Sequence, residues 1–149
     1  MRGNTSLCEA LCHVLGNTCR ILRTAKSYEW NASGRGAILA QQCFKEQAEE
    51  LDAAIDPIAY HILGLGGSAI LDYSDSVVAV NPPASHVIPA LADMISNLVE
   101  GHVQANHSVG AAIDIAREID EVPTVQILAI RVDAHRAFRQ RLLLVSDQL

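Results

Sequence analysis

The strongest constraint in this sequence is an apolar repeat between residues 44 and 65. Apolar side chains follow one another there at alternating steps of four and three: Phe44, Ala48, Leu51, Ile55, Ile58, Ile62 and Leu65. Because an α-helix has 3.6 residues per turn, residues at these steps form one stripe along the helix. Gly64, Gly66 and Gly67 then predict its end. The repeat therefore predicts a long amphipathic helix that buries one side.

Three further segments have the same kind of spacing. The first opens at Ser6, with Glu9 three positions later in a capping-box pattern, and continues for about 25 residues to the break at residues 33–36. The next begins after Pro82-Pro83 and has apolar or histidine side chains at Ile88, Leu91, Ile95, Leu98, His102, Ala105, Val109 and Ala112. The last begins near Pro123, whose fixed φ suits a first helical turn, and continues through Leu128, Val132, His135, Phe138 and Leu142. We therefore expect four long helices.

The lengths of the connections predict how these helices are joined. The link between the second and third helices is long, and residues 69–80 within it are expected to form a short helix across the crossover. One crossover at this point is the arrangement of ferritin-like four-helix bundles, whereas two are needed in cytokine-type bundles. With 149 residues, of which 50% are hydrophobic, the chain is long enough for one core. We predict an all-α fold with residues 1–149 as a single domain.

Charge and hydropathy argue against several classes of partner. The formal net charge is −6, and no basic block is present that could follow a phosphate backbone, so DNA is not an obvious partner. Apolar runs such as 127–130 and 142–145 are far shorter than the roughly 18 residues of a membrane span. The first residues lack the layout of a signal peptide. We expect a protein of the cytoplasm.

Few side chains form an obvious chemical site. Metal sites in such bundles commonly use Glu-x-x-His pairs, and none occurs here. Glu49, Asp52 and Asp56 form an acidic stripe that is interpreted as a solvated face. His102 and His135 fall on apolar seams, where a hydrogen-bonded core role is favoured over a ligand role. The four cysteines, whose role stays open, are interpreted as buried free thiols rather than a zinc site: Cys8, Cys12, Cys19 and Cys43.

Several motifs in this sequence together resemble one family. Trp30-Asn31-Ala32-Ser33-Gly34 is similar to the family's His-Trp-Asn-x-x-Gly, and it is followed at matching spacing by Phe44, residues 46–51, Asp56-x-x-Ala59 and Leu65-Gly66-Gly67. Two later parts match as well: Met94-Ile95-x-x-Leu98-Val99-x-x-His102, and Thr124-x-Gln126-x-Leu128-x-x-Arg131-Val132-x-x-His135. Over nearly its whole length the chain resembles a divergent member of the Dps family, the miniferritins named as DNA-binding proteins from starved cells.

The resemblance implies a function. Dps proteins are hollow dodecamers of four-helix subunits that oxidise Fe(II) with hydrogen peroxide, store the ferric mineral inside and take part in the stress response. Their iron site lies between two subunits, where two His from one subunit face an Asp and a Glu of the two-fold partner. Carried over to this sequence, the His positions hold Glu29 and Gln41, the Asp is kept as Asp56, and Tyr60 replaces the Glu. One of the four ligands is therefore kept in kind, and the resemblance implies a weakened or altered iron site.

The resemblance also bears on iron entry and on DNA. The family has an Asp in its three-fold pore where Gln126 stands, so Glu118, Asp120 and Glu121 are the acidic residues left to attract Fe(II) there. The Lys-rich tail with which some members bind DNA has no counterpart, which argues against DNA binding.

Three functions remain open at this point. The first is a Dps-like cage for iron storage with a degenerate ferroxidase site. The second is an active Fe(II) oxidase with a nonstandard site, so the sequence leaves open whether the chain is an enzyme. The third is a bundle that binds another ligand at the vacated two-fold pocket.

Overall fold

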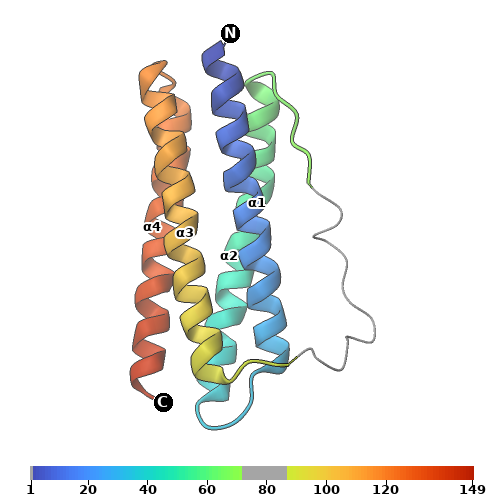
Figure 1. Ribbon diagram of the computed structural model, residues 1–149, viewed down its shortest axis with the longest axis vertical. Coiled ribbons are helices and arrows are strands. Elements are labelled where there is room, and N and C mark those ends of the chain that lie inside the picture. The colour runs from blue at the N-terminus through green and yellow to red at the C-terminus, as the bar shows by residue number, and fades with distance from the viewer. Residues whose placement is uncertain (1, 72–86) are drawn as a thin grey trace.

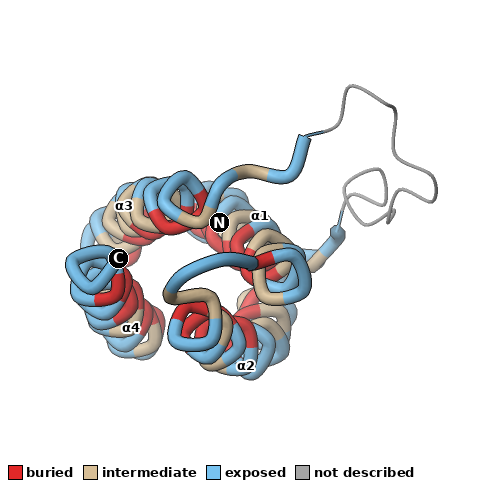
Figure 2. Tube along the Cα trace, turned by 90° about the horizontal axis from the view of Figure 1, so that it is seen from below, coloured by how far each residue is buried: buried red, intermediate tan, exposed pale blue. Residues whose placement is uncertain are grey.

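The computed structural model describes residues 2–71 and 87–149. These residues form four α-helices and no strand: α1 (Arg2–Asn31), α2 (Ala37–Gly64), α3 (Leu91–Glu118) and α4 (Val122–Asp147). The helices lie side by side along one axis (Figure 1), and their buried residues face the centre in the end-on view (Figure 2). The predicted all-α four-helix bundle is confirmed. None of the described helices contains a stretch long and apolar enough to span a bilayer.

The connections confirm one long crossover. Short turns join α1 to α2 and α3 to α4, so each pair is antiparallel. In Figure 1 α2 ends at the top of the bundle and α3 begins at the bottom, so the chain crosses the length of the bundle between them. Of the short helix predicted over residues 69–80, residues 69–71 are not helical and the remainder lies outside the described residues.

The predicted seams supply most of the core. On α2, Phe44, Leu51 and Ile62 are completely buried, and Leu98 and Leu142 are buried on α3 and α4. Ile55, Leu65, Leu91 and Val132 are half-buried, and Ile88 is exposed, at 58%, because it precedes α3. Its inclusion in the third seam was wrong.

Two predicted helix starts also differ from the structure. α1 begins before Ser6, which lies inside the helix, so the capping box predicted at Ser6 and Glu9 does not form the N-terminus. A few polar residues cost only tenths of a kcal/mol each inside a helix, and the buried Leu7 anchors this turn. α3 starts at Leu91 rather than directly after Pro83, because Pro89 disfavours the helical region for the residue before it.

The core is divided by a polar layer. One apolar cluster includes Phe44, Leu98 and Leu142, and the other includes Ile62 and Leu128. On α4, Arg131 and His135 lie between Leu128 and Leu142. We call the following five residues the polar layer: Gln47, Glu50, His102, Arg131 and His135.

Candidate functional site

The turn between α1 and α2 places the first two predicted iron ligands. Gln41, in the first turns of α2, donates from Nε2 to the backbone carbonyls of Glu29 at 3.1 Å and Ala32 at 3.3 Å. Its amide thereby ties the end of α1 to the start of α2. The carboxylate of the half-buried Glu29 makes no ion pair within the described residues. The structure brings these two positions together, and the Gln41 amide nitrogen is already used by the turn.

The other two predicted ligands lie far along α2. Asp56 and Tyr60 are exposed, and the Tyr60 side chain is 69% accessible. Asp56 is 15 residues beyond Gln41 on the same helix, so a rise of 1.5 Å per residue separates their backbones by about 22 Å. A single chain therefore does not bring the four positions together. They form two separate pairs.

The predicted pore residues meet at one end of the bundle. Glu118 ends α3, Asp120 lies in the turn with a φ of 56°, and Glu121 is the N-cap of α4. The Glu121 carboxylate accepts hydrogen bonds from the backbone N–H of Thr124 at 3.4 Å and from its hydroxyl at 3.1 Å. Gln126 is exposed one turn into α4. One of the three carboxylates expected to attract Fe(II) is thus also a helix cap.

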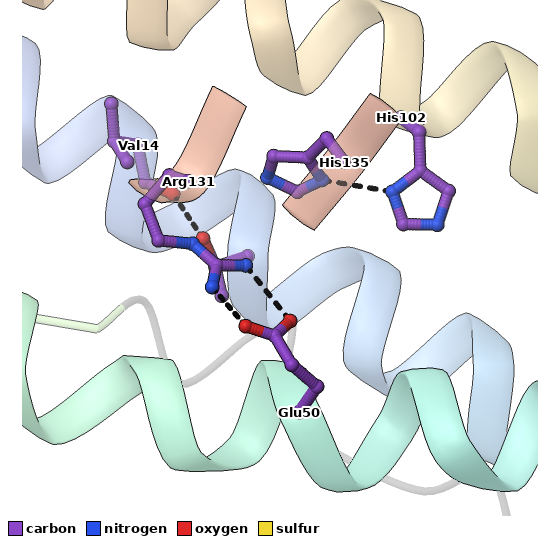
Figure 3. A network of polar contacts seen from close by, with 6 residues as sticks. Val14, Glu50, His102, Arg131 and His135 are labelled. Atoms are coloured by element: carbon purple, nitrogen blue, oxygen red, sulfur yellow. Dashed lines mark hydrogen bonds and ion pairs between the residues drawn. The ribbon is translucent and has the colours of Figure 1, made fainter. Parts of the chain in front are cut away.

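A hydrogen-bond chain crosses the core between α2, α3 and α4. His102 and His135 approach each other with 2.8 Å between their Nδ1 atoms, and His102 Nε2 lies 2.8 Å from Oε1 of Gln47 (Figure 3 shows the histidine pair). Gln47 Nε2 donates onward to Cys43 Sγ at 3.2 Å. Both histidines are 1% exposed. The prediction that they are hydrogen-bonded core residues is confirmed.

The surroundings keep both imidazoles neutral. Burial, together with the positive charge of Arg131, lowers the pKa of His102 to about 4. The pKa of His135 is lowered to about 3 by burial, by His102 and by Arg131, in that order of importance. Two imidazolium rings in contact inside a core would repel each other and lose their hydration. At neutral pH the pair therefore acts through hydrogen bonds and carries no charge.

An ion pair completes the polar layer. The guanidinium of Arg131, 4% exposed, forms a two-point contact with Glu50, in which Nη1 meets Oε1 and Nη2 donates to Oε2 at 3.1 Å (Figure 3). Sequence reasoning missed this pair and the partner role of Gln47. The available signal was a run of polar residues beside the α2 seam together with Arg131 and His135 at helical spacing on α4, which indicates polar core positions without pairing them.

The described residues contain no metal site within one chain. No group of three or more His, Cys, Asp or Glu side chains lies close enough together to hold an ion. All four cysteines are free thiols. Cys19 and Cys43 are buried as the sequence predicted, whereas Cys8 and Cys12 are only half-buried, so the prediction of burial was wrong for these two. An iron site built from the predicted ligands would need residues of a second copy.

Known proteins provide an independent comparison. A family model described as a ferritin-like domain matches residues 8–139. The "DNA protection during starvation protein" of Brevibacillus brevis is 26% identical over 102 residues, which cover 68% of each chain.

Two solved structures show the same fold. The Dps of Thermosynechococcus elongatus has a TM-score of 0.83 at 23% identity, covering 95% of this chain and 90% of that one. A Dps protein of Vibrio cholerae O1, described as a member of a broad superfamily of ferritin-like diiron-carboxylate proteins, has a TM-score of 0.82 at 20% identity, covering 95% and 89%.

The bundle with its single crossover and the match over most of its length place the chain in one class: it belongs to the ferritin-like family. Within that class its relatives are Dps proteins, so the resemblance seen in the sequence motifs is confirmed.

Proposed function

We propose that this chain assembles into a hollow Dps-like cage, a homo-dodecamer of the cytoplasm, which takes up Fe(II) as its substrate, stores it as ferric mineral and protects against oxidative stress. The observation that carries the proposal is the ferritin-like match over residues 8–139, together with a relative named for DNA protection during starvation. The net charge of −6 argues against direct DNA binding.

The separation of the ligand positions supports a site between subunits. Gln41 and Asp56 are about 22 Å apart along α2, so an antiparallel copy related by a two-fold axis can set Asp56 of one chain against Glu29 and Gln41 of the other. The same surfaces expose large apolar side chains, which water disfavours and a second copy would cover: Trp30 is 66%, Ile38 85% and Leu63 53% exposed. We propose this contact as the first step of assembly.

The residues present favour a weak site for Fe(II). Glu29 and Asp56 offer the hard carboxylate oxygens that Fe(II) accepts, and Gln41 offers a neutral carbonyl. Tyr60 places a bulky phenol where the family has a bridging carboxylate. We therefore propose that the cage oxidises Fe(II) at this site slowly compared with its relatives.

Fe(II) oxidation in a sample of known mass tests the proposal. The purified protein is sized by light scattering and titrated with Fe(II) under hydrogen peroxide, while ferric iron is followed by absorbance. A particle of about twelve subunits is expected, with a modest oxidation rate that falls to the protein-free rate in the Glu29→Ala, Asp56→Ala variant. Asp114→Ala, which removes an exposed carboxylate of α3, is the matched control.

Each other outcome has a definite meaning. A monomer or dimer would contradict the cage. A cage whose oxidation equals the protein-free rate would contradict iron oxidation and leave the two-fold pocket to another ligand. A fast reaction that needs Glu29 and Asp56 would contradict the weak site and show a working oxidase with a nonstandard ligand set.

A further inference from the structure

A small cavity opens between α3 and α4 beside the polar layer. Its volume is about 160 Å³, which is room for about five water molecules at roughly 30 Å³ each. Its floor consists of the buried His102 and His135 and the half-buried Asn106, and its rim consists of three exposed basic residues: His107, Arg136 and Arg139. This cavity is distinct from the predicted iron ligands and the pore residues.

The hydrogen bonds between the floor residues determine which of their ring nitrogens donate and which are left as acceptors. In the structure Gln47 directs Oε1 at His102 and Nε2 at Cys43, and because an amide oxygen only accepts, this placement puts the proton of His102 on Nε2. Because His102 is neutral, its Nδ1 is then a bare acceptor, and His135 must donate to it from Nδ1. The remaining nitrogen of His135, Nε2, is left with a lone pair. It is buried and has no hydrogen-bond partner among the described residues.

A second acceptor lies at the same floor. Asn106 donates from Nδ2 to the backbone carbonyl of Val132 at 3.3 Å, which identifies Oδ1 as its free acceptor. That oxygen is also buried without a partner in the part of the chain that the structure describes. Two residues that line the cavity thus carry buried acceptors, which need a hydrogen-bond donor from water or from a ligand, because an unpartnered buried polar group costs about 1–3 kcal/mol.

The rim carries positive charge instead of free acceptors. Arg136 and Arg139 bring two positive charges to a protein whose net charge is −6, and the lining contains no carboxylate. Within residues 2–71 and 87–149, neither guanidinium is within ion-pair distance of an acid. The ligand should therefore carry negative charge on the side that faces the rim.

We propose that this cavity binds a small protonated oxyanion, for which inorganic phosphate is the fitting species. Its P–OH group donates to His135 Nε2 at the floor, and its charged oxygens accept from Arg136 and Arg139 at the rim. Sulfate has the same shape and no proton at neutral pH, so its oxygen would face the lone pair of His135. A phosphate monoester loses its proton above a pKa of about 6 and would be rejected for the same reason. The proposal does not depend on iron.

The discrimination between phosphate and sulfate is the sharpest test. Iron-free protein is used, since ferric iron itself binds phosphate, and each anion is titrated by calorimetry at pH 7.5 and equal ionic strength. Phosphate is expected to bind saturably, one per chain, and about tenfold or more tighter than sulfate, because only phosphate satisfies the buried acceptor. Equal affinities, or no saturable phosphate binding, would overturn the proposal.

Variants assign the binding to this cavity. Arg136→Gln with Arg139→Gln, both on the surface, should weaken phosphate binding about tenfold or more, since two charge-assisted contacts are removed. The matched control is Arg20→Gln with Arg35→Gln, two exposed arginines outside the cavity lining, which should bind as the native protein does. An equal loss of phosphate affinity in both double variants would show that phosphate binding depends only on the overall charge of the protein. His135→Gln should reduce the preference over sulfate, and the anion comparison in the native protein stands even if this core variant does not fold.

Discussion

Two buried histidines hold a layer of the bundle together without carrying charge. Each finds its partners on another helix, so His102 links α2 to α4 through Gln47 and His135. Phe138 stacks on the His102 ring with 5.8 Å between centroids, which limits the ring's rotation. At the scale of single residues, the polar layer therefore fixes which side chains of α2, α3 and α4 face one another.

The neutral histidines predict a pH dependence of stability. The pKa of His102 is lowered from 6.5 to about 4 and that of His135 to about 3, so below pH 6.5 the unfolded chain binds protons that the folded chain refuses. The contribution of the two neutral histidines to the free energy of unfolding is therefore complete above pH 6.5. It declines as the pH falls toward about 4 for His102 and about 3 for His135, by at most about 2.7 kcal/mol per pH unit for two protons.

Urea unfolding at pH 7, 6 and 5 measures this decline. The His102→Gln, His135→Gln variant should lose less stability than the native protein over the same range. The exposed His13→Gln should behave as the native protein does. Identical pH slopes in all three proteins would contradict neutral histidines in the folded state.

The Arg131 and Glu50 pair predicts a marked asymmetry between single and double variants. Glu50→Leu leaves a buried guanidinium without its carboxylate and should cost about 2–4 kcal/mol in the free energy of unfolding, somewhat reduced because Glu50 is partly exposed. Arg131→Met with Glu50→Leu removes both charges and should recover most of that loss. Chemical denaturation of the three proteins gives the values, and a double variant as unstable as the single one would contradict this account.

At the scale of elements, glycine marks the boundary between α1 and α2. Gly34 and Gly36 have φ values of 89° and 81°, a left-handed conformation that residues with a Cβ adopt only at a cost. Gln41 then closes the turn from α2. The local sequence therefore determines the position of this turn, and the turn places Glu29 beside Gln41.

Two glycine-to-alanine substitutions should change the stability of the protein in opposite directions. At Gly34 no atom lies within 4 Å of an added Cβ, so Gly34→Ala tests only the backbone and should destabilise by about 1–2 kcal/mol. Gly16 lies inside α1 with equally open space, and Gly16→Ala should stabilise by about 0.5–1 kcal/mol. Thermal unfolding compares the two, and a shift of the same sign in both would refute the assignment of strain to the turn.

At the scale of the whole molecule, a single chain does not bring the four predicted iron ligands together. Gln41 and Asp56, one from each pair of ligand positions, lie about 22 Å apart along α2, and large apolar side chains beside them face water. The proposed second copy of the chain would explain both features, since it would cover the apolar surface and complete the ligand set.

Restoring the family's ligands tests this explanation. Glu29→His, Gln41→His and Tyr60→Glu together should raise the rate of Fe(II) oxidation by peroxide about tenfold or more, since imidazole and carboxylate are good iron ligands. The same triple change combined with Asp56→Ala is the control and should remove the gain. An assembled cage that shows no acceleration would contradict the placement of the iron site at these positions.

The sequence alone determined the class of fold. The steps of four and three make one face of each helix apolar, and burying these faces together is what forms a bundle. The glycines at the α1–α2 turn predicted the break between the first two helices, and the long segment after Gly67 predicted the crossover. Both signals are local in the sequence. Pro89 shows the limit, since a single residue, and not the apolar repeat, sets where α3 starts.

The tertiary structure alone decided the polar contacts. Glu50 and Arg131 are 81 positions apart, and Gln47 and His102 are 55 apart, so no local pattern pairs them. The free lone pair of His135 follows only from a chain of hydrogen bonds across three helices. Periodicity specifies which face of a helix is buried, whereas the partner of a buried polar group depends on how helices are aligned along the bundle, and only the packed core sets that alignment.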